Sequence, residues 1–170
     1  ADTVGYHGDQ DHHISLYRDY VIDAFNDNLN FQQFTLDQIA GDLLPNPSDE
    51  QIIATGYNRL LQTSHEGGVQ AKEYLTIYAA DRIRNLSAVW LGATVGCAQC
   101  HDHKFDPLTQ KEFYQFGAFF NNVDEVGMNS DDGNCGPTLL LLPDSSKQQL
   151  AAIKKLIEKT ETAIKENKDQ

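Results

Sequence analysis

The sequence predicts an all-α protein, and two observations carry that prediction. The first is the capping box, a helix-start pattern in which a Ser or Thr is followed three residues later by a Gln or Glu. The pattern occurs at Thr35/Gln38, Ser48/Gln51, Thr109/Glu112 and Ser145/Gln148. The second is that each match leads into a segment whose apolar side chains recur every three or four residues, which is the period of a helix.

Three helices are expected in the N-terminal half. The first covers about residues 14–26, where aromatic and aliphatic side chains share one face. The second runs from Thr35 towards Leu44, and Pro45-Asn46-Pro47 stops it because proline cannot continue a helix. The third starts at Ser48, and the Gly-containing segment 64–68 ends its pattern as a loop.

Three more helices are expected in the C-terminal half. The longest covers about residues 70–94 and leads directly to Cys97. The next covers about residues 110–121, and its aromatic side chains suit either a core or the wall of a cofactor pocket: Phe113, Tyr114, Phe116, Phe119 and Phe120. A polar loop, 124–137, precedes a last, amphipathic helix over about 145–165.

The apolar residues of the last helix alternate three and four apart, as in a heptad seam: Leu150, Ile153, Ile157, Thr160 and Ile164. Two heptads are too few to establish a coiled coil. The helix is therefore expected to pack either on the preceding domain or on other parts of a longer protein.

The charge of the chain argues against two classes of partner. Asp and Glu outnumber Lys and Arg by 25 to 13, for a net charge of −12, which argues against binding nucleic acid or an anionic membrane. No apolar run reaches the length of about 18 residues that a membrane-inserted helix needs. An acidic surface suits a solvated domain and could also steer a basic redox partner.

Residues 96–101, Gly-Cys-Ala-Gln-Cys-His, contain the sharpest chemical signal in the chain. Cys-x-x-Cys-His is the attachment signature of a c-type haem. In this interpretation Cys97 and Cys100 add to the two vinyl groups of one porphyrin, and His101 is the proximal ligand of the iron. Such a histidine donates its other ring N–H to a carbonyl or carboxylate, which fixes its tautomer.

Two other kinds of site compete for the same cysteines. Cys97, Cys100 and His103 could bind zinc with Cys135 as the fourth ligand, although structural zinc sites usually draw on two close pairs of ligands. A dithiol redox motif is the third possibility, but it normally follows a strand in an α/β fold. A helical chain without a second cysteine pair favours haem.

The sixth iron ligand decides between functions, and the sequence leaves it open. Met128, the only methionine, would give a low-spin electron-transfer site of raised potential. His65 and Cys135 are the other candidates, whereas the polar segment around His7, His12 and His13 favours solvation. A vacant or water-bound position would instead allow small-ligand or peroxide chemistry. His103 lies on the same side of the ring as His101, so we expect it to form hydrogen bonds within the loop or to a propionate.

Several ordered stretches of the chain resemble the planctomycete cytochrome-like domain family, over about residues 6–126. The matching stretches are Phe31-Gln32-Gln33-Phe34-Thr35, residues 38–45, Ala54-Thr55-Gly56-Tyr57, Glu66-Gly67-Gly68, Asp81-Arg82, Val89-Trp90-Leu91-Gly92 and residues 96–107. The resemblance implies a c-type haem domain of the bacterial cell envelope that commonly precedes a second domain in large secreted proteins. Within it, Glu66-Gly67-Gly68 and Asp81-Arg82 are interpreted as a structural loop and a buried ion pair rather than as haem contacts.

Together these observations predict an all-α, monohaem c-type cytochrome domain over residues 1–143, followed by a C-terminal amphipathic helix over 144–170. The helices after Thr35, around Trp90 and from Phe113 to Phe120 are expected to wall the haem. One-electron transfer to a redox partner protein or adjoining domain is favoured over an independent enzyme. A haem enzyme or sensor with an open iron site and a zinc-stapled interaction module are the alternatives. Because haem c is attached outside the cytoplasm, the expected compartment is periplasmic or otherwise extracytoplasmic, with an export signal lost upstream of Ala1.

Overall fold

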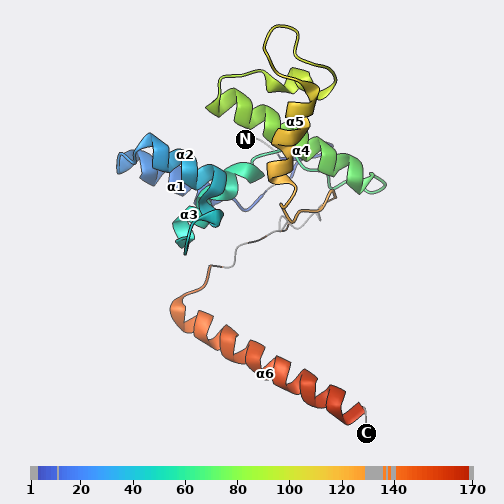
Figure 1. The fold of residues 1–170 in the computed structure, drawn as a ribbon. Helices are drawn as coiled ribbons and strands as arrows, with labels where there is room; N and C mark the ends of the chain where they lie inside the picture. The colour runs from blue at the N-terminus through green and yellow to red at the C-terminus, as the bar shows by residue number, and fades with distance from the viewer. Residues whose placement is uncertain (1–3, 11, 129–135, 137, 139–140, 169–170) are drawn as a thin grey trace. The chain divides into compact units, whose positions relative to one another are not determined.

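Every regular element in the described part of the chain is a helix, which confirms the all-α prediction. The structure, a computed structural model, describes residues 4–10, 12–128, 136, 138 and 141–168. The α-helices are α1 (Ser15–Asn26), α2 (Phe31–Ala40), α3 (Asp49–Ala54), α4 (Ala71–Trp90), α5 (Gln110–Gly117) and α6 (Asp144–Lys168). Short 3₁₀ helices are η1 (Gly41–Leu43), η2 (Thr55–Arg59), η3 (Val95–Gln99) and η4 (Ala118–Phe120) (Figure 1).

The chain forms two compact units, Ala1–Thr138 and Leu139–Gln170. The first contains α1 to α5 and the cysteine motif, and the second contains α6. Among the described residues, no helix combines the length and the apolar character that crossing a membrane would require.

Two of the four expected capping boxes form as predicted. Ser48 caps α3 and Thr109 caps α5. In each box the hydroxyl accepts from the backbone N–H of the residue three positions later, Gln51 or Glu112, and the side chain of that residue accepts from the backbone N–H of the cap. The prediction for Thr35 is wrong. Helix α2 begins one turn earlier because the side chain of Asn30 caps it, accepting from the Gln33 N–H at 2.9 Å.

The remaining start and the helix ends differ from the expectations by a few residues. Helix α6 begins at Asp144, so Ser145 lies in its first turn rather than at the cap position. Helix α4 ends at Trp90 and not at 94, because Gly92 adopts a left-handed backbone (φ 61°) and the Ala93 N–H turns back to the Ser87 carbonyl at 2.9 Å.

The different contributions of the Thr109 and Thr35 hydroxyls to stability can be measured. We expect Thr109→Ala to lower the free energy of unfolding by about 1 kcal/mol, because it removes an acceptor for a first-turn N–H. Thr35→Ala is the matched control, since the Thr35 hydroxyl only donates to the Phe31 carbonyl inside α2, and we expect a change within about 0.5 kcal/mol. Urea unfolding followed by circular dichroism tests both, and equal losses would contradict the capping assignment.

The core of the first unit joins α4, η3 and α5. Ala80 and Ile83 of α4 pack with Val95 and Ala98 of η3 and with Phe113 of α5, and all five side chains are buried. The helices follow one another here: the chain leaves α4, passes through η3 and the yellow loop, and returns along α5 (Figure 1). This core supports the segment that carries the two cysteines.

Candidate haem-attachment site

Cys97 lies in the short 3₁₀ helix η3, and Cys100 is the residue that caps its C-terminal end. A 3₁₀ helix repeats every three residues, so side chains three positions apart lie above one another. In η3 this spacing places Val95 and Ala98 in the core, while Cys97 and Cys100, at the end of the helix, are exposed free thiols. The Cys-x-x-Cys spacing is therefore matched to the local helix, with one face for packing and one for the thiols.

Gly96 lets the motif approach α4 closely. A side-chain carbon at this position would lie 2.6 Å from Cγ of Arg84, which is closer than carbon atoms pack. The glycine immediately before the first cysteine thus has a packing reason, because it allows η3 to lie against the helix that supports it.

His101 is held as one defined tautomer. Its Nδ1 lies 2.8 Å from the Asp102 carbonyl oxygen. A carbonyl only accepts hydrogen bonds, so Nδ1 carries a proton, and in the neutral ring Nε2 then carries the lone pair. This is the arrangement that a metal-ligating imidazole needs, with the second nitrogen bound to an oxygen that orients the ring.

Helix α5 anchors the C-terminal end of the motif. The side chains of Gln110 and Tyr114 both donate to the Gln99 carbonyl oxygen at 3.1 Å. In return, the Asp102 carboxylate accepts from the Gln110 backbone N–H at 2.7 Å, at the N-terminus of α5 where a negative charge is favoured. The residues on both sides of Cys100 and His101 are therefore tied to one helix.

These anchoring residues were not predicted from the sequence. The only available signal was that Asp102 follows His101 directly and that a helix begins eight residues after Asp102. Which carbonyl the Gln110 and Tyr114 side chains reach depends on how the loop folds back.

His103 has a structural role in the loop, in line with the expectation of hydrogen bonding there. Its Nδ1 accepts from the Asp106 N–H at 2.8 Å, so its Nε2–H donates to the Thr94 hydroxyl at 3.1 Å. Both ring nitrogens are thus engaged, and zinc would have to displace one of these contacts. Cys135 lies outside the described residues, and within those described no group of three or more His, Cys, Asp or Glu side chains could hold a metal ion.

The residues at the motif fit covalent haem attachment. Two free thiols lie on one exposed face, followed by an imidazole whose Nε2 lone pair is available, on backbone that α4 and α5 support. Large apolar surface is exposed next to them in the chain, at Leu91 and Phe105. Of the side chains expected to wall a haem, Phe113 belongs to the core, and Trp90 packs against Phe34 and Tyr57.

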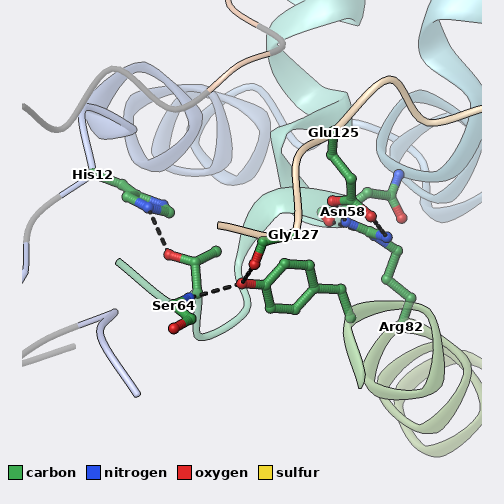
Figure 2. A network of polar contacts seen from close by, with 8 residues as sticks. His12, Asn58, Ser64, Arg82, Glu125 and Gly127 are labelled. Carbon is green, nitrogen blue, oxygen red and sulfur yellow. Dashed lines mark hydrogen bonds and ion pairs between the residues drawn. The ribbon is translucent and has the colours of Figure 1, made fainter. Parts of the chain in front are cut away.

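The segments that carry Met128 and His65 are attached to Tyr78 of α4 through the neighbouring residues Gly127 and Ser64. The Tyr78 hydroxyl donates to the Gly127 carbonyl at 3.1 Å and accepts from the Ser64 N–H at 2.7 Å (Figure 2). Gly127 also lies against Ala71, in the first turn of α4. The motif packs on Ala80 and Ile83 of α4, which lie two and five residues beyond Tyr78. No contact among the described residues supports either side chain as the sixth ligand.

The comparison with known families agrees with the resemblance in the sequence. A sequence model of the family PSCyt2, described as a protein of unknown function (DUF1549), matches residues 1–125. The chain belongs to the PSCyt2 family. No curated protein and no solved structure matches the chain significantly. Membership of a planctomycete-type domain family is thereby confirmed.

The region matched to PSCyt2 ends at Glu125, which is half of a buried ion pair. The Arg82 guanidinium donates to both Glu125 carboxylate oxygens, at 2.7 and 2.5 Å, and its Nε donates to the Asn58 carbonyl at 2.9 Å (Figure 2). The interpretation of Asp81-Arg82 as a buried ion pair is correct for Arg82, but its partner is Glu125 and not Asp81. The contact lies between segments 43 residues apart, so no local pattern indicates it.

A histidine contact fastens the N-terminal segment of the PSCyt2 domain. His12 Nε2 lies 3.2 Å from the Thr63 hydroxyl (Figure 2). The Tyr6 backbone N–H also donates to the Thr63 carbonyl at 3.1 Å. Burial lowers the pKa of His12 below its ordinary value of 6.5, and the nearby Arg59, His65 and His13 lower it further. The folded domain therefore prefers a neutral imidazole at this position.

This preference predicts a loss of stability in mild acid. Because the pKa of His12 is lower in the folded than in the unfolded chain, its contribution is complete above pH 6.5 and is lost as the pH falls through the folded-state pKa. Thermal unfolding between pH 7.5 and 5 should show this decline, and His12→Gln should flatten it. His13→Gln, at the exposed neighbouring residue, should retain most of it. Parallel profiles for wild type and His12→Gln would contradict the assignment.

Proposed function

We propose that this PSCyt2 domain is a monohaem c-type cytochrome that transfers single electrons within, or from, a larger cell-envelope protein. Cys97 and Cys100 would form the two thioether bonds, and His101 would ligate the iron through Nε2. The observation that carries the proposal is the local geometry, in which two exposed thiols on one helical face precede a histidine whose tautomer is already suited to a metal.

The chain's own residues supply attachment, orientation and electrostatics. When bound, haem provides a one-electron couple at iron. The Asp102 carbonyl holds the His101 ring, and the contacts of Gln110 and Tyr114 with Gln99 keep the motif in place. A net charge of −12 would attract a partner with a basic surface and would make association dependent on ionic strength.

The same proposal implies an extracytoplasmic compartment. Thioether bonds to haem are made by machinery on the outer side of the energy-transducing membrane, so a haem-loaded domain belongs in the periplasm or an equivalent space. The proposed partner is a redox protein or an adjoining domain of the same chain.

An optical spectrum tests the proposal. The domain is made together with haem-attachment machinery, and spectra are recorded oxidised, reduced and after denaturation in pyridine. Haem that stays bound after denaturation, with a c-type spectrum, is the expected result. A colourless protein made with competent machinery would overturn the proposal, and retained zinc in that protein would favour the zinc-stapled module.

A haem enzyme or sensor with an open iron site is the second candidate. The observation that favours it is the attachment of the segments bearing Met128 and His65 to Tyr78 rather than to the motif. Carbon monoxide added to the reduced protein distinguishes the two functions. A high-spin spectrum that shifts with carbon monoxide supports the open site, whereas an unreactive low-spin spectrum supports electron transfer.

A further inference from the structure

The peptide group between Asp102 and His103 is held at both of its polar ends. Its carbonyl oxygen lies 2.8 Å from Nδ1 of His101. Its N–H donates to the Leu108 carbonyl at 2.7 Å. In a planar trans peptide the N–H and the C=O point in opposite directions. The bond to Leu108 therefore directs the Asp102 carbonyl away from Leu108 and towards the His101 ring.

The side chain of Asp102 ties the same residue to a second element. Its carboxylate accepts from the Gln110 backbone N–H at 2.7 Å, in the first turn of α5. The first N–H groups of a helix have no partner inside it, and the positive end of the helix dipole favours a carboxylate there. Asp102 thus binds α5 with its side chain and His101 with its main chain.

The histidine that follows holds the other end of this peptide group. The His103 ring accepts from the Asp106 N–H at 2.8 Å and donates to the Thr94 hydroxyl at 3.1 Å. The peptide is therefore held through His103 on one side and through the Asp102 carboxylate on the other. The carboxylate is the tether directly beside His101 that a substitution can remove while the main-chain bonds stay in place.

These bonds form a chain that ends on the imidazole of His101. The Leu108 carbonyl accepts from the peptide N–H, and the carbonyl of the same peptide accepts from the imidazole. Hydrogen bonds in such a chain polarise one another, so the Asp102 carbonyl becomes a stronger acceptor. A strong acceptor at Nδ1 makes Nε2 a better electron donor to a metal. A better donor favours the oxidised iron and lowers its reduction potential.

We propose that Asp102 is a positioning residue for His101. Its carboxylate, bound at the N-terminus of α5, holds its own carbonyl against the imidazole and so sets both the tautomer and the donor strength of that ring. The tautomer is a property of the chain without haem, whereas the effect on iron rests on the function proposed above. Asp102 acts through His101 and not on the iron itself.

Nitrogen-15 NMR of the whole chain without haem, labelled at histidine, reads the tautomer of His101. The spectra are recorded above about pH 8, where the imidazole is neutral. A solvated histidine prefers its proton on Nε2, so a wild-type ring with the proton on Nδ1 is a distinctive expected result. Asp102→Ala should shift the ratio of the two tautomers about threefold or more towards Nε2–H. Asp102→Asn should stay within about twofold of wild type, because its amide oxygen still accepts from the Gln110 N–H.

Glu112→Ala is the matched control for the tautomer. It also removes a carboxylate from the first turn of α5, together with the hydrogen bond to the Thr109 N–H, but it leaves Asp102 in place. The tautomer ratio of His101 should therefore stay as in wild type. A wild-type ring with its proton on Nε2, an unshifted Asp102→Ala, or equal shifts in Asp102→Ala and Glu112→Ala would overturn the proposal.

The reduction potential of the haem-loaded chain tests the effect on iron. Asp102→Ala, Asp102→Asn and Glu112→Ala all lose one negative charge near the motif, so differences among them report the hydrogen bond to His101. Asp102→Ala should have the highest potential of the three. Equal potentials would overturn the assigned effect on donor strength. A wild-type chain that takes up no haem would instead overturn the function proposed above, and the NMR spectra would still decide the role of Asp102.

Discussion

Replacing Arg82 by methionine is expected to lower the free energy of unfolding of the first unit by about 3–5 kcal/mol. The Arg82 side chain is 3% exposed and that of its partner Glu125 is 12% exposed, so the substitution leaves a nearly buried carboxylate without its counter-charge. It also removes the Nε donor from the Asn58 carbonyl. Chemical unfolding of the purified domain measures the loss, together with a check that the slope of the transition is unchanged.

Burial, and not the ion pair as such, is the cause of this expected loss. Arg18 also contacts a carboxylate, that of Asp19 at 2.8 Å, but the Arg18 side chain is 71% exposed. Arg18→Met is therefore the matched control, and we expect it to cost less than about 1 kcal/mol. The double variant Arg82→Met/Glu125→Leu should be more stable than Arg82→Met alone, because it leaves no unpaired charge. An Arg82→Met variant within about 1 kcal/mol of wild type would contradict the role assigned to this pair.

Replacing both Cys97 and Cys100 by serine is expected to abolish covalent haem attachment completely. A hydroxyl does not add to a porphyrin vinyl group as a thiolate does, so no bond to the ring remains. Each single variant keeps one exposed thiol and should retain part of the covalent haem. Its spectrum in pyridine should lie between that of a haem with no thioether bond and that of a haem with two. The retained haem is measured after denaturing electrophoresis and by the pyridine spectrum.

Cys135→Ser separates the haem proposal from the zinc alternative. Under the haem proposal the thioether bonds form at Cys97 and Cys100, so this variant should retain covalently attached haem as the wild type does. In the zinc-stapled module Cys135 is a ligand, and its loss should release zinc and destabilise the domain. Covalent haem in the Cys97→Ser/Cys100→Ser variant would exclude the proposed attachment residues.

The starts of two helices show what local sequence determines. At Ser48 and Thr109 the capping residue and its partner are three positions apart, so the geometry of a single turn completes both hydrogen bonds. Thr35 carries the same pattern but lies inside α2. Asn30 caps the helix a turn earlier, and the Thr35 hydroxyl then donates to a carbonyl within the helix.

The candidate site likewise has features that local sequence determines and contacts that only the fold determines. The spacing of Cys97 and Cys100, and the order of Cys100 and His101, are local, so the sequence alone indicates both the residues and the chemistry. The contacts that orient them depend on loop closure onto α5, and they were found only in the structure.

The sequence by itself determined the helical class, the main helices, two of the caps, the family and the candidate attachment residues. Each of these depends on the period of a helix or on residues within a few positions of one another. Only the tertiary structure decided that Arg82 pairs with Glu125, that His103 is engaged within its loop, and that the segments of Met128 and His65 meet at Tyr78. The physical reason is range: contacts between segments tens of residues apart follow from how helices pack, and no periodicity in the chain records that packing.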